Sequence, residues 1–180
     1  RELFTQIGVH YDVVNVDVDE TKLPRETPEQ YVQRVALAKA QAGFQTLNDA
    51  AAIVLGGDTS VVCDGQVFGK PADREDALAM LDALSGKAHE VYSAVSIVNA
   101  DRQLTRLIKT KVTFYPLTLA QAEAYWQTGE PQGKAGGYAI QGLGAVFVAA
   151  IEGSYSGVVG LPVAETAQML AEFGVAIWDR

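Results

Sequence analysis

The stretch that decides the fold is AAIVLGGDTSVVCDGQVFGKPADREDALAMLDALSGKAHEV, residues 51–91. It opens with a short apolar run at 53–55, which predicts a buried strand that stops at Gly56-Gly57 and leaves Asp58 just beyond it. Open α/β sheets present ligand-binding and metal-binding side chains at the carboxyl ends of such strands. A plainer interpretation is that Asp58 caps a turn and uses the backbone freedom of the two glycines. The residues alone leave both interpretations open.

Strands and helices alternate outward from this run. The pair Asp64-Gly65 is typical of a tight hairpin, and Thr27 with Gln30 three residues later forms a capping box, the signature of a helix start. The strands that we expect are 11–18, 53–55, 61–63, 66–68, 90–100, 105–117 and 137–153. The helices that we expect are 1–7, 27–44, 74–84, 119–129 and 161–174. This order predicts an α/β fold with a mixed sheet, because long hairpins occur beside helical connections.

Composition limits the class of protein. The chain has 180 residues, 48% of them hydrophobic, enough for the core of one domain or of two closely packed lobes. A single cysteine, Cys63, excludes an intrachain disulfide framework and a zinc cluster built on cysteines. Glu2 and Gln6 interrupt any apolar core of a signal peptide, so we expect a cytoplasmic protein without a membrane span. The net charge of −8 disfavours nucleic acid as a partner, whereas a small anion bound together with a metal ion is compatible with it.

Charged side chains near the central run suggest a site for such an anion. Lys70 stands between a glycine and a proline, so its backbone is expected to be extended and its amine to reach back toward Asp58. The acidic segment DVDE, residues 17–20, offers oxygen ligands for Mg²⁺. A solvated lysine and a solvated acidic loop are the plain alternatives.

A glycine-rich segment, QGKAGGYAIQGLG at 132–144, surrounds Lys134 and Gln141. Glycines let the backbone approach a ligand closely, and a glutamine amide can pair with both the donor and the acceptor edge of a base. The competing interpretation is a glycine-bent strand in a curved sheet. His89 is interpreted mainly as part of a strand.

The stretch GGDTSVVCDGQVFGKPADREDALAMLDALSGKAHEVYSAV resembles the central signature of the Maf family of nucleoside triphosphate pyrophosphatases. That signature reads G-[AG]-D-T, then G-K-P, then A-x-x-M-L-x-x-L-S-G-x-x-H. KAGGYAIQGLGAVFV and IEGSYSGVVGLPVAET resemble later blocks of the family, in the same order. The AIQG block is similar to the branch that hydrolyses dTTP and UTP. The resemblance extends over nearly the whole chain and implies a single Maf-like domain, residues 1–180.

The resemblance implies an elongated mixed sheet flanked by helices, with a central cleft between two lobes, as in the inosine triphosphate pyrophosphatases. It implies hydrolysis of dTTP or UTP to the monophosphate and pyrophosphate, with Mg²⁺ or Mn²⁺ as cofactor and the nucleotide as partner. A homodimer is a further partner that it leaves open. The implied roles are a general base and metal ligand for Asp58, a metal ligand for Glu20, phosphate contacts for Lys39 and Lys70, and base choice for Thr59 and Gln141.

One family block is not found in the printed sequence. The family opens with a block like L-A-S-x-S-P-R-R, which grips the triphosphate, and this chain starts after it, at RELF. A nucleotide-binding regulator without turnover therefore stays open as an alternative. A Maf-like pyrophosphatase of another base specificity is a second alternative to the dTTP/UTP enzyme.

Overall fold

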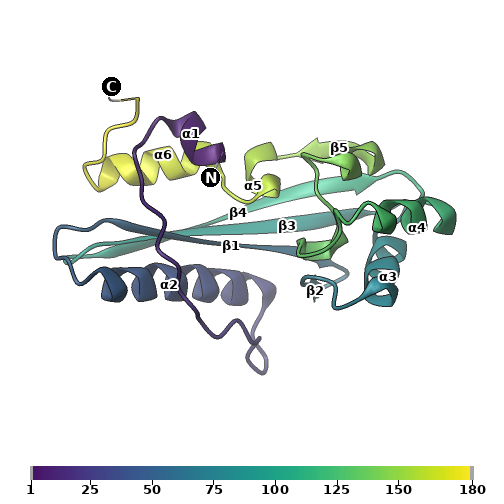
Figure 1. The fold of residues 1–180 in the computed structure, drawn as a ribbon, viewed down its shortest axis with the longest axis horizontal. Coiled ribbons are helices and arrows are strands. Elements are labelled where there is room, and N and C mark those ends of the chain that lie inside the picture. The colour runs from purple at the N-terminus through teal and green to yellow at the C-terminus, as the bar shows by residue number, and fades with distance from the viewer. Residues whose placement is uncertain (1, 179–180) are drawn as a thin grey trace. The chain divides into compact units, whose positions relative to one another are not determined.

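The computed structural model describes residues 2–178, and Figure 1 shows their arrangement. The α-helices are α1 Glu2–Ile7, α2 Pro28–Leu47, α3 Arg74–Leu84, α4 Leu119–Gln127, α5 Tyr155–Val159 and α6 Val163–Glu172. The strands are β1 Val54–Cys63, β2 Gln66–Phe68, β3 Ala88–Val98, β4 Gln103–Phe114 and β5 Val148–Glu152. Two 3-10 helices, η1 Ala135–Gly137 and η2 Leu143–Phe147, lie between α4 and β5.

The strands form one sheet in the order β2-β1-β3-β4-β5. β1 pairs with β2 and β4 with β5 in antiparallel register, and a tight turn in which Asn99 N donates to Arg102 O joins β3 to β4. The predicted α/β class with a helix-flanked sheet is confirmed. The sheet itself is antiparallel, where the sequence suggested a mixed one, because the connection through α3 brings the chain back as β3 on the other side of β1, in the same direction as β2 and opposite to β1.

Helix ends follow the local signals in the sequence. The predicted capping box at the start of α2 is present: Thr27 accepts from Gln30 N, and the Gln30 side chain accepts from Thr27 N. Thr118 and Gln121 form the same arrangement before α4. α5 was not predicted. None of the helices within residues 2–178 is long and apolar enough to cross a membrane.

The hairpin between β1 and β2 is also confirmed. Cys63 pairs with Gln66, and the two residues between them have φ of 50° and 77°, the left-handed values that a two-residue turn of this kind requires. Asp64 and Gly65 tolerate these values at low cost, which fixes the register of the hairpin.

The strand predicted at 11–18 is wrong. These residues have no regular secondary structure. Their side chains do alternate, since Val14, Val16 and Val18 are half-buried between exposed neighbours. Alternation of buried and exposed side chains shows that one side of an extended segment packs against the rest of the protein. The segment would be part of a sheet only if its backbone formed hydrogen bonds with a neighbouring strand.

The strand predicted at 53–55 does not stop at the two glycines. β1 continues through them to Cys63 and includes the predicted strand at 61–63, so Asp58 lies in the middle of a strand rather than after its end. Neither Gly56 nor Gly57 has positive φ. The glycines therefore do not make a turn, and the turn-cap interpretation of Asp58 is wrong as well.

The strand predicted at 137–153 is largely wrong. Only Val148–Glu152 is a strand, and the residues before it form turns and the short helices η1 and η2. Gly136 and Gly137 have φ of 68° and 71°, values that a strand does not contain. The glycine-rich segment is a folded loop, not a bent strand.

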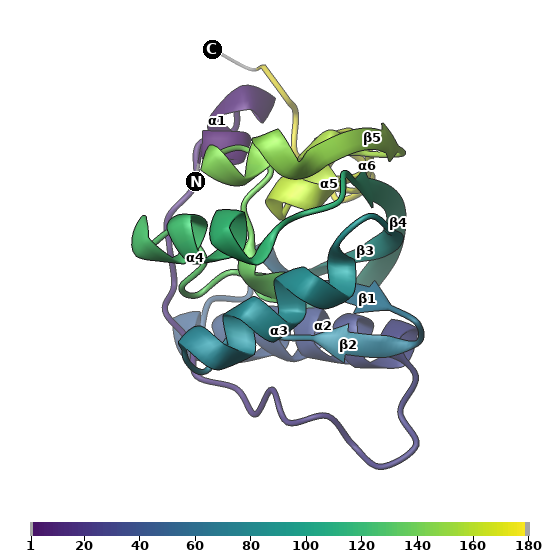
Figure 2. The same cartoon turned by 90° about the vertical axis from the view of Figure 1, so that its right-hand side faces the viewer.

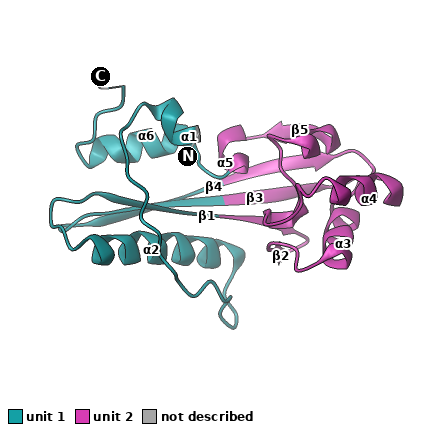
Figure 3. Ribbon diagram, in the orientation of Figure 1, with its two compact units in different colours: residues 1–58, 93–108, 160–180 teal, residues 59–92, 109–159 magenta. Residues whose placement is uncertain are grey.

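Two compact units divide the described residues, as Figure 3 shows in two colours. Unit 1 holds residues 2–58, 93–108 and 160–178, and unit 2 holds 59–92 and 109–159. The cleft between lobes and the single Maf-like domain stay predictions.

Unit 1 is a layered arrangement around its part of the sheet. In Figure 1, α2 covers one face, and α1 and α6 cover the other. On the α6 side, buried side chains from α1, β3 and α6 form one apolar cluster: Ile7, Val95, Ile97, Leu161, Met169, Leu170 and Phe173. Unit 1 therefore has a core of its own.

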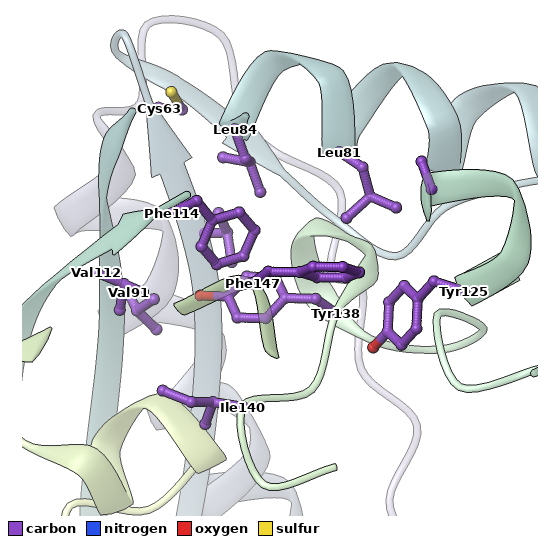
Figure 4. Packing of buried hydrophobic residues seen from close by; sticks show 12 residues of the cluster. Cys63, Leu81, Leu84, Val91, Val112, Phe114, Tyr125, Tyr138, Ile140 and Phe147 are labelled. Atoms are coloured by element: carbon purple, nitrogen blue, oxygen red, sulfur yellow. The ribbon is translucent and has the colours of Figure 1, made fainter. Parts of the chain in front are cut away.

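Unit 2 has a second, more aromatic core, drawn in Figure 4. Phe114 contacts Tyr138 edge to face at a centroid distance of 4.7 Å, and Tyr125 contacts Phe147 at 5.0 Å. Leucines of α3 point into the same cluster, and Figure 2 shows α3 lying beside α4. This core holds the glycine-rich loop against the sheet.

Candidate active site

The site in unit 1 begins with the close approach of α2 to β1. A Cβ atom on Gly56 would lie 2.5 Å from both Ala36 O and Ala40 N, which are backbone atoms of α2. Only glycine allows this approach. Because side chains two residues apart in a strand share a face, Asp58 points to the same side as Gly56, toward α2.

Lys39 on α2 meets two carboxylates. Its Nζ lies 3.0 Å from Asp58 Oδ1 and 2.8 Å from Oε1 of Glu20, which belongs to the irregular segment before α2. The Asp58 side chain is 11% exposed and that of Glu20 is 42% exposed, so the cluster is buried at one end and open at the other. The structure thus brings together three predicted site residues that are far apart in the sequence. The sequence predicts the amine of Lys70 near Asp58. In the structure, the amine of Lys39 lies beside Asp58.

The charges of this cluster act on one another. Burial of Lys39 by itself lowers its pKa, but hydrogen bonds to Glu20 and Asp58 and their negative charges outweigh burial, so the pKa of Lys39 is raised. Tyr31, two turns earlier on α2, also has a raised pKa, first through burial and then through the negative charges of Asp58 and Glu20. Lys39 therefore remains a cation at neutral pH, held by two anionic groups.

The donor atoms at this position fit a divalent metal ion. Glu20 and Asp58 direct carboxylate oxygens to one point, where the Lys39 ammonium group lies. Mg²⁺ is commonly held by one or two carboxylates, with water and substrate phosphates completing its shell. No group of three or more His, Cys, Asp or Glu side chains suited to a metal was found among residues 2–178. Two carboxylates suffice for an ion that is bound together with phosphates.

The other predicted site residues lie in unit 2. Thr59 is half-buried in β1 and points away from the Asp58 face, since neighbours in a strand alternate. Lys70 is exposed on the bend between β2 and α3, and Lys134 is exposed just before η1. Gln141 is exposed in the turn before η2.

Lys70 and Lys134 belong to backbone segments that a hydrogen bond joins. Gly136 N donates to Gly69 O at 3.0 Å; Gly69 precedes Lys70 directly, and Gly136 lies two residues after Lys134. A Cβ on Gly136 would lie 2.8 Å from Val61 Cγ2, so this segment lies close against β1. Both lysines are exposed, and an exposed ammonium group is a donor of the kind that phosphate oxygens bind.

His89 has the structural role that the sequence favoured. It is buried in β3, its Nε2 lies 2.7 Å from the hydroxyl of Tyr138, and its ring meets Phe114 edge to face. Burial lowers the pKa of His89 to about 4, so the imidazole is neutral at physiological pH.

Sequence reasoning missed two polar residues. Tyr31 was not singled out, although it lies eight residues, about two turns, before Lys39. Glu130 was not singled out, although it stands between a glycine and a proline just before the glycine-rich segment.

Comparison with known proteins adds a family and named relatives. A family model described as Maf-like protein matches residues 1–173. The dTTP/UTP pyrophosphatase of Pseudoalteromonas atlantica is 54% identical over 177 residues, which cover 97% of this chain and 92% of that relative. Proteins of the same name from Alkalilimnicola ehrlichii and Saccharophagus degradans are each 51% identical. Those two matches cover 97% and 100% of this chain and 88% and 87% of the relatives.

The family match spans both units and includes the residues of the Lys39 cluster. Together with relatives of about half-identical sequence over nearly the full chain, it shows that this protein belongs to the family of Maf-like proteins.

Proposed function

We propose that the chain is a nucleoside triphosphate pyrophosphatase that converts dTTP and UTP to their monophosphates and pyrophosphate. The observation that carries this proposal is the cluster of Asp58, Glu20 and Lys39, partly buried at one end and open to solvent at the other. The names of relatives at 51–54% identity support the choice of reaction and of substrate.

In the proposed reaction, Asp58 accepts a proton from a water molecule whose oxygen attacks the α-phosphorus in line. The bond between the α-phosphorus and its bridging oxygen breaks, and pyrophosphate leaves with that oxygen. A carboxylate positioned by hydrogen bonds suits this role. Lys39 holds Asp58 and Glu20 in place until substrate and metal bind.

We further propose Mg²⁺ or Mn²⁺ as the cofactor, held by Glu20 and Asp58 together with phosphate oxygens of the substrate. When bound, such an ion neutralises negative charge that develops on the phosphates. Lys39, Lys70 and Lys134 are proposed to contact phosphate oxygens when substrate is bound. Thr59 and Gln141 are proposed to contact the base. The cytoplasm, where free nucleotides occur, is the proposed location.

The test of the proposed function is a panel of nucleoside triphosphates assayed for pyrophosphate release with each divalent metal. We expect dTTP and UTP to be hydrolysed well, CTP less well and purine triphosphates poorly. In the Gln141→Ala variant, the ratio of kcat/KM for dTTP or UTP to that for a purine triphosphate should fall by about 5- to 150-fold, the effect of one lost hydrogen bond. The ratio falls because hydrolysis of the pyrimidine nucleotides becomes slower. A preference for GTP or 7-methyl-GTP in side-by-side kcat/KM values would contradict the choice of base. Tight binding without pyrophosphate release would instead indicate a regulator.

A second prediction concerns Lys70. Replacing it with alanine should lower kcat/KM for dTTP by about 10- to 150-fold, because a hydrogen bond between charged groups contributes about 1.5–3 kcal/mol. The melting temperature should hardly change, since Lys70 is exposed. Lys87→Ala is the matched control: Lys87 is also exposed in unit 2, where its amine lies 3.6 Å from Asp64. Equal kinetics for both variants would refute phosphate binding by Lys70.

A further inference from the structure

A carboxylate in unit 2 holds the loop that carries Gln141. Glu130 Oε2 accepts a hydrogen bond from Leu143 N at 2.8 Å, and its Oε1 accepts from Gly144 N at 2.9 Å. Both amides belong to the first turn of η2, directly after the turn that holds Gln141. One side chain thus receives two neighbouring backbone donors of the loop.

Tyr125 fixes Glu130 from the other side. Its hydroxyl donates to Glu130 Oε1 at 2.7 Å and accepts from Ala139 N at 3.1 Å. Tyr125 as a whole residue is 5% exposed, and its ring lies in the aromatic core of unit 2 (Figure 4). The pair therefore ties residues on both sides of Gln141, at 139 and at 143–144, to one buried anchor.

The loop has no room for larger residues at these contacts. A Cβ on Gly142 would overlap the Glu130 carboxylate, and one on Gly144 would lie 2.7 Å from the Tyr125 hydroxyl oxygen. Gly142 and Gly144, which follow Gln141, therefore allow the loop backbone to lie close to the Glu130–Tyr125 pair, in addition to any approach of a ligand.

The charge of Glu130 is part of this arrangement. Burial by itself raises its pKa, but hydrogen bonds from Tyr125, Gly144 and Leu143 outweigh burial and hold the pKa below its usual value. Hydrogen bonds to an ionised acceptor are stronger than those between neutral groups. An alanine leaves all three donors without this acceptor, and a glutamine presents an NH₂ group to at least one of them.

We propose that Glu130, through Tyr125 and the amides of Leu143 and Gly144, is a positioning residue that sets base selectivity by fixing the loop of Gln141. The predicted change in base selectivity rests on the proposed function, because it assumes that Gln141 binds the base of the nucleotide. The holding of the loop by Glu130 can be tested without any substrate.

The first measurement is amide hydrogen exchange in the whole protein. In Glu130→Ala, the amides of Leu143 and Gly144 should exchange at least about tenfold faster than in the wild type, because they lose their acceptor. Glu152→Ala is the matched control, since Glu152 is an exposed residue of unit 2 paired with Lys111 on the surface. Unchanged exchange at both loop amides in a folded Glu130→Ala protein would overturn the proposal, whatever the enzyme hydrolyses.

The second measurement is the ratio of kcat/KM for dTTP to that for GTP. We expect this ratio to fall by about 5- to 150-fold in Glu130→Ala, as for a lost hydrogen bond, and to stay at the wild-type value in Glu152→Ala. In a Gln141→Ala background, Glu130→Ala should change the ratio no further, because the two residues act through one contact. A fully additive effect, or an equal loss for both nucleotides, would overturn the proposal.

Tyr125→Phe provides a milder variant if Glu130→Ala fails to fold. It keeps the ring in the core and removes only the hydroxyl group that joins Glu130 to Ala139. The ratio should move in the same direction by a smaller factor, and an unchanged ratio together with unchanged exchange at Leu143 and Gly144 would count against the proposal. A wild-type protein that does not hydrolyse dTTP would refute the proposed function, while the exchange result would still decide the holding of the loop.

Discussion

Asp58→Asn is expected to lower kcat for dTTP hydrolysis by about 10²- to 10⁴-fold, the usual cost of removing a general base. Asparagine keeps the shape of the side chain and an oxygen that can accept from Lys39 Nζ, which lies 3.0 Å from Asp58 Oδ1. It cannot take a proton from water. The measurement is pyrophosphate release under saturating nucleotide, with folding checked by thermal unfolding.

Asp64→Asn is the matched control for that variant. Asp64 lies six residues later, in the turn that ends β1, where it is exposed and has φ of 50°. Asparagine tolerates this φ, so the fold should be kept. We expect full activity in the control. Wild-type turnover in a folded Asp58→Asn protein would contradict the role of Asp58 as the base.

Local signals allowed the described α-helices other than α5, and the first hairpin, to be predicted. The capping box of Thr27 with Gln30 involves four consecutive residues, and the Asp64-Gly65 turn involves two. All the interacting residues are therefore neighbours in the sequence, where a local pattern can reveal them. The buried clusters of both units include side chains from these helices, so packing agrees with the local signals.

The wrong strand boundaries have a common physical cause. Two sequence patterns led to these errors: the alternating valines at 14, 16 and 18, and the glycines at 56 and 57. The structure that each pattern adopts depends on which other segment of the protein lies beside it. The first segment lacks a strand partner, although its alternation is real. Gly56 lies inside a strand, and a glycine is required there because a helix backbone lies against it, not because the chain turns. A neighbour that comes from elsewhere in the chain cannot be read from a local pattern.

The candidate site was predicted only in part for the same reason. Asp58, Glu20 and Lys39 were named, the last through family resemblance alone, but the two ion pairs that join them span 19 residues each. Glu130 was missed because its role depends on amides that lie 13 and 14 residues later. Charge in a sequence identifies candidates, and the fold decides which of them meet.

Gly56→Ala is the second large effect that we expect. The new Cβ would lie 2.5 Å from Ala36 O and Ala40 N, and since both are backbone atoms, α2 must move rather than a side chain turn aside. Overpacking of this kind lowers the free energy of unfolding by about 1–3 kcal/mol or more. Movement of α2 also moves Lys39 relative to Asp58, and a displacement of about 1 Å at a site can cost about 10²-fold in rate. Urea unfolding and kcat/KM for dTTP measure the two effects.

Gly57→Ala separates this clash from the general effect of replacing glycine. Its Cβ would meet nothing closer than Ala94 O at 3.5 Å, an ordinary contact. Both substitutions lower the entropy of the unfolded chain, and each thereby raises the free energy of unfolding by the same amount, about 0.4–1 kcal/mol. The difference in stability between the two variants therefore reports the folded state alone. Gly57→Ala should unfold near the wild-type urea concentration, with Gly56→Ala clearly below it. If the two variants unfolded together and kept equal activity, the close approach of α2 to β1 would not be what places Lys39 beside Asp58.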